Sequence, residues 1–195
     1  MKNNLLLIGL LSICCIVLAF TTVPTQEAPM TTETIAGKNV QWMTWEEAVE
    51  ATNEALKRGE TPKKMFIDIY TDWCGWCKKM DQQTFEHQKI SKYLNDNFYP
   101  VKFNAEQRTS ITFQGHEFKF VSQGRRGYHE LAAALLDGKM SYPTVVFLNE
   151  DFQLLQRIPG YLDVNVFDTI MHYLAEEHYK QTPWADYQKS YKVEN

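Results

Sequence analysis

Cysteine is scarce in this sequence, with four among 195 residues, and two of them, Cys14 and Cys15, lie in an apolar stretch near the N-terminus. The remainder of the chain therefore has only Cys74 and Cys77. A domain that depends on disulfides for its stability needs several cysteine pairs, so this composition excludes a disulfide scaffold. Two cysteines three positions apart are typical instead of a redox pair or of half of a metal site.

Positive charge is not in excess either. The chain has 20 Lys and Arg against 24 Asp and Glu, which gives a net charge of -4 and a pI near 5.7. Because no basic stripe overrides this balance, we expect no nucleic-acid partner. With 44% hydrophobic and 23% charged residues, the chain has enough apolar material for the packed core of one domain, which excludes the disordered class.

Charged residues are absent between Lys2 and Glu27, a stretch that includes the apolar run 5–20. A cation followed by such a run is typical of a secretory signal peptide. A membrane span needs about 20 apolar residues, and residues 21–23 could extend the run into an uncleaved anchor. The segment that ends at Cys14 faintly resembles a lipoprotein processing site, which is a third interpretation.

Export follows from each of these interpretations. We expect residues 1–23 to be a signal peptide or N-terminal anchor. Residues 24–39 are rich in Thr, Pro and Glu, and we expect them to be a flexible linker. The expected location is the periplasm, or the outer face of the inner membrane if the N-terminal segment tethers the protein there.

The sequence predicts one α/β domain over residues 40–180, followed by a C-terminal extension over 181–195. Thr44 and Glu47 have the spacing of a capping box at the start of a helix. Helical periodicity then alternates with short runs of strand-forming residues. The predicted helices are 44–59, one that follows Cys77, 90–98, 128–136, 164–177 and 184–191, and the predicted strands are 65–70, 99–104, 144–148 and 153–158, with a hairpin over 111–120.

The two cysteines lie in the segment Trp73-Cys74-Gly75-Trp76-Cys77-Lys78, directly after a predicted strand and at the start of a predicted helix. In this context a C-x-x-C motif is typical of thiol redox chemistry. The helix N-terminus stabilises a thiolate at Cys74 and lowers its pKa, so we expect Cys74 to be the accessible nucleophile. Cys77 follows one helical turn later and is positioned to attack a mixed disulfide on Cys74. We therefore expect Cys77 to be the shielded resolving thiol and the pair to form a disulfide.

A metal site is the main alternative for a lone C-x-x-C motif. The sequence has no second such motif, and its five histidines are scattered without zinc-finger spacing. A c-type haem site requires His directly after the second cysteine, where this chain has Lys78. We expect no metal and no cofactor, while a metal-delivery role and a redox-inert interaction module both remain open as alternatives.

Over residues 40–177 the chain resembles the thioredoxin family. In that family a buried Asp six residues before the first cysteine accepts the proton of the resolving thiol, and Asp68 has this position. An acid within an apolar strand should also have a raised pKa, which suits it to proton transfer near neutrality. Lys102 resembles the family lysine that lies near this acid. The resemblance thus implies a thioredoxin fold, a central mixed sheet flanked by helices, with Asp68 and Lys102 beside the two cysteines.

The resemblance also implies a substrate-binding surface. Pro143, in Tyr142-Pro143-Thr144 ahead of a predicted strand, resembles the family's cis-proline, which lies against the cysteines and presents backbone to an extended substrate. Gly160 similarly resembles a family glycine at the exit of the last strand. The implied substrate-binding residues are those of the motif and of the proline segment, namely Trp73, Gly75, Trp76, Tyr142, Pro143 and Thr144.

Two features depart from the family pattern. The dipeptide between the cysteines is Gly-Trp, as in exported thioredoxin-like proteins, where thioredoxin itself has Gly-Pro. An insertion over about 105–141 also precedes the strand of the cis-proline. It carries several aromatic residues, which we expect to cover the core, and the pair Arg125-Arg126, which we expect to be solvated.

These observations predict a thiol-disulfide oxidoreductase that acts on exported proteins. We expect it to reduce or exchange disulfides and not to be a strong oxidant, because Trp76 stands where strong oxidants of the family tend to carry His, and Trp adds no positive charge near the Cys74 thiolate. The expected partners are disulfides of exported proteins and a membrane or periplasmic thiol donor. We expect the protein to be a monomer.

Overall fold

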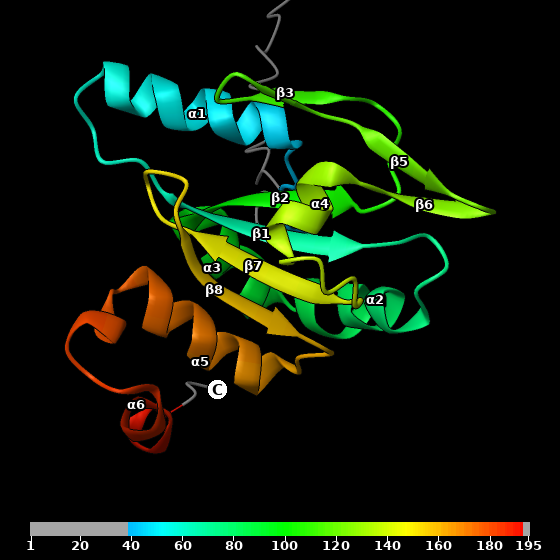
Figure 1. Ribbon diagram of the computed structural model, residues 1–195. Helices are drawn as coiled ribbons and strands as arrows, with labels where there is room; N and C mark the ends of the chain where they lie inside the picture. Colours follow the sequence, from blue (N-terminus) through cyan, green and yellow to red (C-terminus); the bar gives the residue numbers. More distant parts are fainter. Residues whose placement is uncertain (1–38, 193–195) are drawn as a thin grey trace, which may run out of the picture. The chain divides into compact units, whose positions relative to one another are not determined.

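The computed structural model describes residues 39–192 (Figure 1). The predicted signal peptide or anchor (1–23) lies outside the described residues, as do all but the last residue of the predicted linker (24–39) and residues 193–195 of the C-terminal extension. Within residues 39–192, no helix is both long and apolar enough to cross a membrane.

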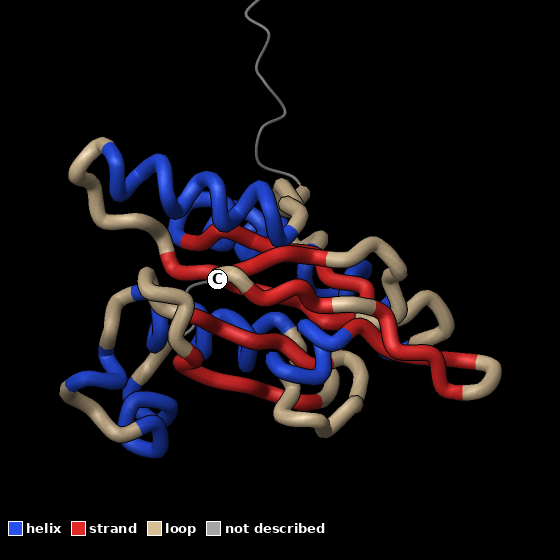
Figure 2. Tube along the Cα trace, turned by 45° about the horizontal axis from the view of Figure 1, so that its top comes forward, coloured by secondary structure: helices blue, strands red, loops and turns tan. Residues whose placement is uncertain are grey.

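A four-stranded mixed sheet forms the centre of the described structure, with the strand order β2-β1-β7-β8. Strand β1 (Lys64–Tyr70) is parallel to β2 (Phe98–Asn104) and antiparallel to β7 (Thr144–Leu148). Strand β8 (Leu154–Pro159) pairs antiparallel with β7 and forms one edge (Figure 2). The predicted mixed sheet is therefore present, and β1, which carries Asp68, lies inside it.

Helices cover both faces of this sheet (Figure 1). Along β1, Met65, Ile67 and Ile69 share one apolar core with α1 (Trp45–Lys57) and α4 (Glu130–Leu135). Phe66 lies in a second core, on the opposite face, with α3 (Gln88–Asn97) and α5 (Val164–Ala175). Side chains alternate between faces along a strand, so Asp68 points to the same face as Phe66.

Local sequence signals explain where the main helices begin. The Thr44 hydroxyl accepts the Glu47 backbone N–H at 3.2 Å, and the Glu47 carboxylate accepts the Thr44 N–H at 2.7 Å, which is the capping box predicted for α1. Asp163 caps α5 by accepting the Val166 N–H at 2.9 Å. Helix α2 (Gly75–Met80) follows the first cysteine and continues into a π-helical turn over Asp81–Phe85.

The insertion differs from the prediction. It forms two hairpins, β3 (Ile111–Phe113) with β4 (His116–Phe118) and β5 (Phe120–Gln123) with β6 (Arg126–His129). The predicted helix 128–136 was wrong at its start, because residues 128 and 129 complete β6 and the helix begins at Glu130, where the His129 side chain caps it. The hairpin predicted over 111–120 is present as β3–β4, but it ends at Phe118. Phe120 belongs to the second hairpin, and between the two the Lys119 carbonyl accepts the Glu130 N–H.

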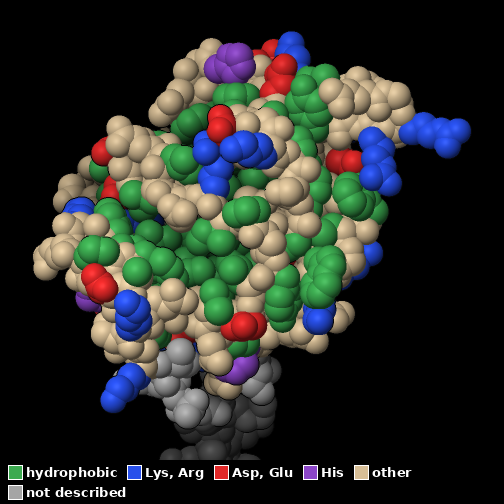
Figure 3. All heavy atoms as spheres, turned by 60° about the horizontal axis from the view of Figure 1, so that its bottom comes forward, with side chains coloured by type: hydrophobic (Ala, Val, Ile, Leu, Met, Phe, Trp, Pro, Cys, Tyr) green, Lys and Arg blue, Asp and Glu red, His purple; other side chains and the backbone are tan. Residues whose placement is uncertain are grey.

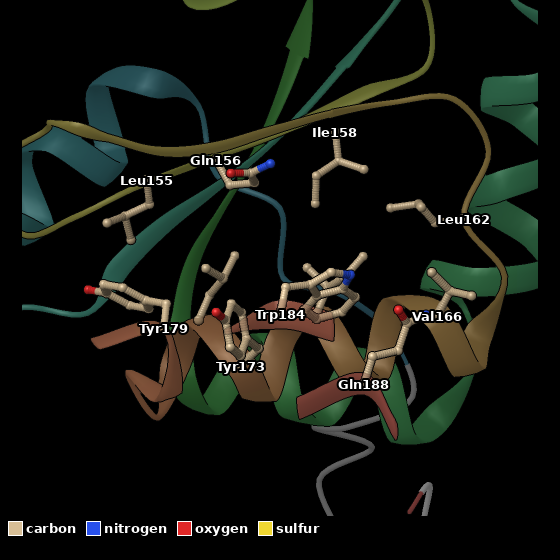
Figure 4. A pocket seen from close by; sticks show the side chains of 11 residues that line it. Leu155, Gln156, Ile158, Leu162, Val166, Tyr173, Tyr179, Trp184 and Gln188 are labelled. Carbon is tan, nitrogen blue, oxygen red and sulfur yellow. The ribbon is translucent and has the colours of Figure 1, made fainter. Parts of the chain in front are cut away.

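A hollow of about 540 Å³ lies between β8, α5 and the short helix α6 (Trp184–Ser190) (Figure 4). Apolar side chains such as Leu155, Ile158 and Trp184 line it, together with Gln156 and Gln188. Figure 3, in which the lower side of Figure 1 faces the reader, shows hydrophobic side chains gathered on this side of the molecule. The hollow contains none of the predicted site residues, so it is separate from the two cysteines.

Candidate redox site

A disulfide joins Cys74 and Cys77 at the start of α2, with their Cα atoms 5.3 Å apart. Cys74 is the N-cap residue of this helix, and its Sγ accepts the backbone N–H of Cys77 at 3.1 Å. An N–H group directed at sulfur stabilises negative charge there, as does the positive end of the helix. The geometry thus favours the thiolate at Cys74 over that at Cys77 when the pair is reduced.

Both cysteines are buried in the disulfide form, with 5% of Cys74 and 2% of Cys77 exposed. These values describe the disulfide form, and the accessible Cys74 expected in the reduced protein stays a prediction. The hydrogen bond to the sulfur of Cys74, and not exposure, is what distinguishes the two residues.

Asp68 lies in the sheet with 1% of its surface exposed. One carboxyl oxygen, Oδ2, accepts a hydrogen bond from Lys102 Nζ at 2.6 Å, and the other, Oδ1, has no hydrogen-bond partner among the described residues. Burial disfavours the charged carboxylate and raises the pKa of Asp68 to about 6, although the positive charge of Lys102 acts in the opposite direction. The strand residue predicted as a proton acceptor therefore titrates close to neutrality.

Lys102 also forms an ion pair with Asp81, a residue that the sequence analysis did not select. Burial opposes the charge of Lys102, but the two carboxylates outweigh it and raise the pKa of the lysine. The rings of Trp42 and Tyr70 lie 4.8 and 4.9 Å from its ammonium group. Asp81 stands four residues after Cys77, so helical spacing was the signal that could have identified it.

The proline segment directly precedes β7, an inner strand of the sheet. The Tyr142–Pro143 peptide bond is cis, as the resemblance implied. The carbonyl of Pro143 accepts the Gly160 N–H at 2.8 Å, and the Thr144 hydroxyl donates to the Ser141 carbonyl at 2.8 Å. Gly160 has a φ of 97°, a left-handed conformation that other residues rarely adopt. The glycine after β8 thus connects the end of that strand to the cis-proline.

The two tryptophans of the motif are exposed, Trp73 by 50% and Trp76 by 57%. Trp73 contacts Tyr142 edge to face at 5.9 Å, which brings the motif and the proline segment together. Trp76 lies 5.6 Å from the ring of Tyr161. A Cβ atom at Gly75, between the tryptophans and the disulfide, would meet no atom within 4 Å, so the surface at this glycine is open.

Each tryptophan also carries a cation over its ring. Arg126 from the insertion lies 4.3 Å from the Trp73 ring, and Lys79 lies 4.7 Å from the Trp76 ring. Arg126 is exposed, as expected for a solvated pair, but it also contacts the motif, because β6 brings it next to Trp73. No sequence signal connected positions 73 and 126, whose contact depends on the fold of the whole insertion.

Within residues 39–192, no group of three or more His, Cys, Asp or Glu side chains has an arrangement that could hold a metal ion.

Comparison with known proteins gives similarities of several kinds. A family model described as a thioredoxin-like domain matches residues 49–175. The disulfide bond reductase DsbH of Chlamydia pneumoniae is 24% identical over 65% of this chain and 67% of its own length. An uncharacterised protein of Caenorhabditis elegans is 29% identical over 48% of this chain, and spermatogenesis-associated protein 20 of the mouse is 31% identical over 37%. The matched segments span only 12% and 8% of the lengths of the latter two proteins.

Solved structures show the same fold. A thioredoxin-fold protein from Helicobacter pylori superposes with a TM-score of 0.50 at 15% identity, over 65% of this chain and 83% of its own. A DsbH oxidoreductase superposes with a TM-score of 0.50 at 18% identity, over 77% and 94%. The thioredoxin fold predicted from the motif is confirmed, and the family model matches more than half of the sequence. The chain belongs to the thioredoxin-like domain family.

Proposed function

We propose that this protein is a thiol-disulfide oxidoreductase that reduces or exchanges the disulfides of exported proteins. The observation that carries the proposal is the Cys74–Cys77 disulfide at a helix N-terminus, on a domain whose buried Asp68 has a pKa of about 6. Similarity to a protein named as a disulfide bond reductase supports the reducing direction.

The proposed reaction starts from the reduced pair. The Cys74 thiolate attacks one sulfur of a substrate disulfide, which forms a mixed disulfide and releases one substrate thiolate. The Cys77 sulfur then attacks Cys74 Sγ, which releases the second substrate thiolate and forms the Cys74–Cys77 disulfide. Two electrons pass to the substrate, and an external dithiol must reduce the protein again.

Asp68 is the proposed acceptor of the Cys77 proton in the second step. A carboxylate accepts a proton efficiently when its pKa is close to the working pH, and the burial of Asp68 supplies this condition. Lys102 keeps enough of the carboxylate ionised near neutrality through its hydrogen bond to Oδ2. Asp68 and Lys102 are thus assigned to proton transfer, and the sulfur chemistry to Cys74 and Cys77.

The proposed substrate surface consists of the exposed motif residues Trp73, Gly75 and Trp76 and the segment Tyr142-Pro143-Thr144. The apolar N-terminal run supports export to the periplasm or tethering to the outer face of the inner membrane. A membrane or periplasmic thiol donor is then the proposed source of electrons.

Substitution of each cysteine tests the order of events. After reduction, Cys77→Ser should accumulate a mixed disulfide with a protein substrate such as insulin, because the resolving thiol is missing. Cys74→Ser should form no such adduct and should not reduce insulin. Mass spectrometry of acid-quenched samples would detect the adduct. If Cys74→Ser formed the adduct and Cys77→Ser did not, the assignment of Cys74 as nucleophile would be contradicted.

A further inference from the structure

The hairpin β5–β6, residues 120–129, is fixed at its base to the central sheet. His129, at its end, is fully buried, and its backbone N–H donates to the Ala105 carbonyl directly after β2 at 2.7 Å. Its ring Nδ1 accepts the Leu131 N–H at 3.2 Å, so Nε2 carries the proton that reaches the Thr109 carbonyl at 3.1 Å. Burial lowers the pKa of His129, so the ring is neutral and this anchor keeps its charge state near neutral pH.

The two strands of the hairpin approach each other unusually closely at Gly127. A Cβ atom there would lie 2.3 Å from the ring of Phe120 and 2.3 Å from the Val121 carbonyl oxygen. The Phe120 ring in turn lies 4.4 Å beneath the guanidinium of Arg108. Only glycine fits this position, so the direction of the hairpin next to Arg126 is fixed by packing.

This hairpin places the Arg126 guanidinium over the ring of Trp73, the residue before the proposed nucleophile. Lys79 has the matching place over Trp76 and Tyr161, at 4.7 and 5.4 Å. Among the ion pairs of the described residues, none involves Arg126 or Lys79. Two exposed aromatic rings with uncompensated cations therefore flank the disulfide.

We propose that the hairpin β5–β6 is a specificity element, in which Arg126 binds an acidic side chain next to the cysteine of the substrate. The inference rests on the proposed disulfide exchange, because it assigns a substrate class to that site. A guanidinium held on an aromatic ring is oriented in advance, and its free N–H groups suit a carboxylate. The net charge of -4 does not prevent the binding of an acidic side chain, because the cations that lie over the two tryptophan rings make the local charge positive.

The test uses three peptides of equal length, each with one cysteine joined to 2-mercaptoethanol by a disulfide. Glu, Gln or Lys flanks the cysteine. The fully reduced protein reacts with each peptide in a single turnover at low ionic strength, and each rate is divided by the rate at which dithiothreitol reduces the same peptide. We expect the wild-type protein to prefer the Glu peptide over the Gln peptide by roughly fivefold, and the preference to shrink in salt.

A matched pair of variants separates recognition from bulk charge. Arg126→Gln should abolish most of the preference for the Glu peptide. Arg125→Gln removes the same charge from the same hairpin, but Arg125 contacts no ring among residues 39–192, so this variant should keep the preference. Both residues are exposed, and thermal unfolding would verify that both variants fold.

Equal rates for the three peptides would overturn the specificity proposal while leaving disulfide exchange intact. An equal loss of preference in the two variants would also overturn it, because only net charge would then matter. If neither the peptides nor 2-hydroxyethyl disulfide were reduced, the proposed function itself would fail, and the inference with it.

Discussion

Strand β1 carries two clusters of similar composition, each with one lysine and two carboxylates. At its start, Lys64 forms ion pairs with Glu150 at 2.9 Å and Glu177 at 3.2 Å. Near its end, Asp68 and the lysine of the adjacent strand, Lys102, form the cluster that includes Asp81. In the first cluster the lysine is the buried member, with 8% of its side chain exposed, whereas in the second the most buried member is Asp68, with 2%.

The identity of the buried member decides what each cluster can do. Burial opposes the charge of Lys64, but its two carboxylates outweigh this effect and raise its pKa, so the lysine is charged at every pH at which the protein works. Asp68 has one cation to offset its burial, and its pKa rises to about 6. One lysine and two carboxylates thus give a permanent structural connection at one end of β1 and a group that exchanges protons at the other.

The largest expected effect is on the rate of disulfide exchange, which should depend on the Asp68 cluster and not on the Lys64 cluster. Asp68→Asn should slow the release of reduced substrate by about a hundredfold at pH 7.5, because Cys77 loses its proton acceptor, while formation of the mixed disulfide continues at nearly its normal rate. Rapid acid quenching and chromatography of both substrate thiols would measure the two steps. Glu150→Gln is the control from the other cluster and should change neither step, and equal slowing of both steps in Asp68→Asn would count against proton transfer.

A second prediction concerns the pH dependence of stability. The folded disulfide form holds the Asp68 proton up to about pH 6, whereas the unfolded chain loses it near 3.8, so the folded state binds more protons between these values. The contribution of Asp68 to the free energy of unfolding must therefore fall as pH rises from about 4 to 6, by on the order of 2 to 3 kcal/mol.

In Asp68→Asn the free energy of unfolding should not show this fall between about pH 4 and 6, because asparagine does not titrate. Urea unfolding of the oxidised wild-type protein and of the variant at several pH values should show the difference in stability moving in favour of the variant as the pH rises. Parallel curves for the two proteins would mean that the burial of Asp68 does not shift its pKa. Glu150→Gln should track the wild type through this range.

The smallest expected effects are those of replacing the lysine of each cluster. Lys102→Met removes the charge that lowers the pKa of Asp68, so the pH midpoint of substrate release should move upward and release at pH 7 should slow by roughly tenfold. Lys64→Met should leave this midpoint unchanged and only lower stability, by about 1 kcal/mol, since its carboxylate partners are partly exposed to water. The pH profile of single-turnover release would measure both, and a shifted midpoint in Lys64→Met would erase the distinction between the clusters.

Local signals in the sequence predicted the parts of the structure that depend on short-range physics. The capping box at Thr44, the buried strand with Asp68, and the motif at a strand-to-helix junction all follow from neighbouring residues, and the structure has each of them. The alternation of strands and helices predicted an α/β domain, and the resemblance to the thioredoxin family implied its mixed sheet.

The insertion could not be predicted in the same way. The alternation Phe118-Lys119-Phe120 looks like one strand, but the two phenylalanines belong to different hairpins, because Phe118 pairs with Ile111 and Phe120 with His129. The stacking of Arg126 on Trp73 joins residues that are distant in sequence, and it depends on close packing at Gly127. Such contacts arise from tertiary structure, and neither periodicity nor composition carries them.

Within the insertion, Ala105 and His129 lie side by side, since the His129 N–H donates to the Ala105 carbonyl. The segment between these residues is a closed loop whose length costs only about 0.6 kcal/mol of loop-closure entropy for each doubling. It also contributes to the core, since Ile111 is buried in one cluster with residues of β1 and α1. An exchange of this segment as one unit must therefore keep an apolar residue at the place of Ile111, so that the packing on β1 is preserved. The proposed specificity role of Arg126 would place partner choice and electron transfer in separable stretches of the chain, and a graft at residues 105 and 129 that keeps the apolar core residue is the natural way to engineer one without the other.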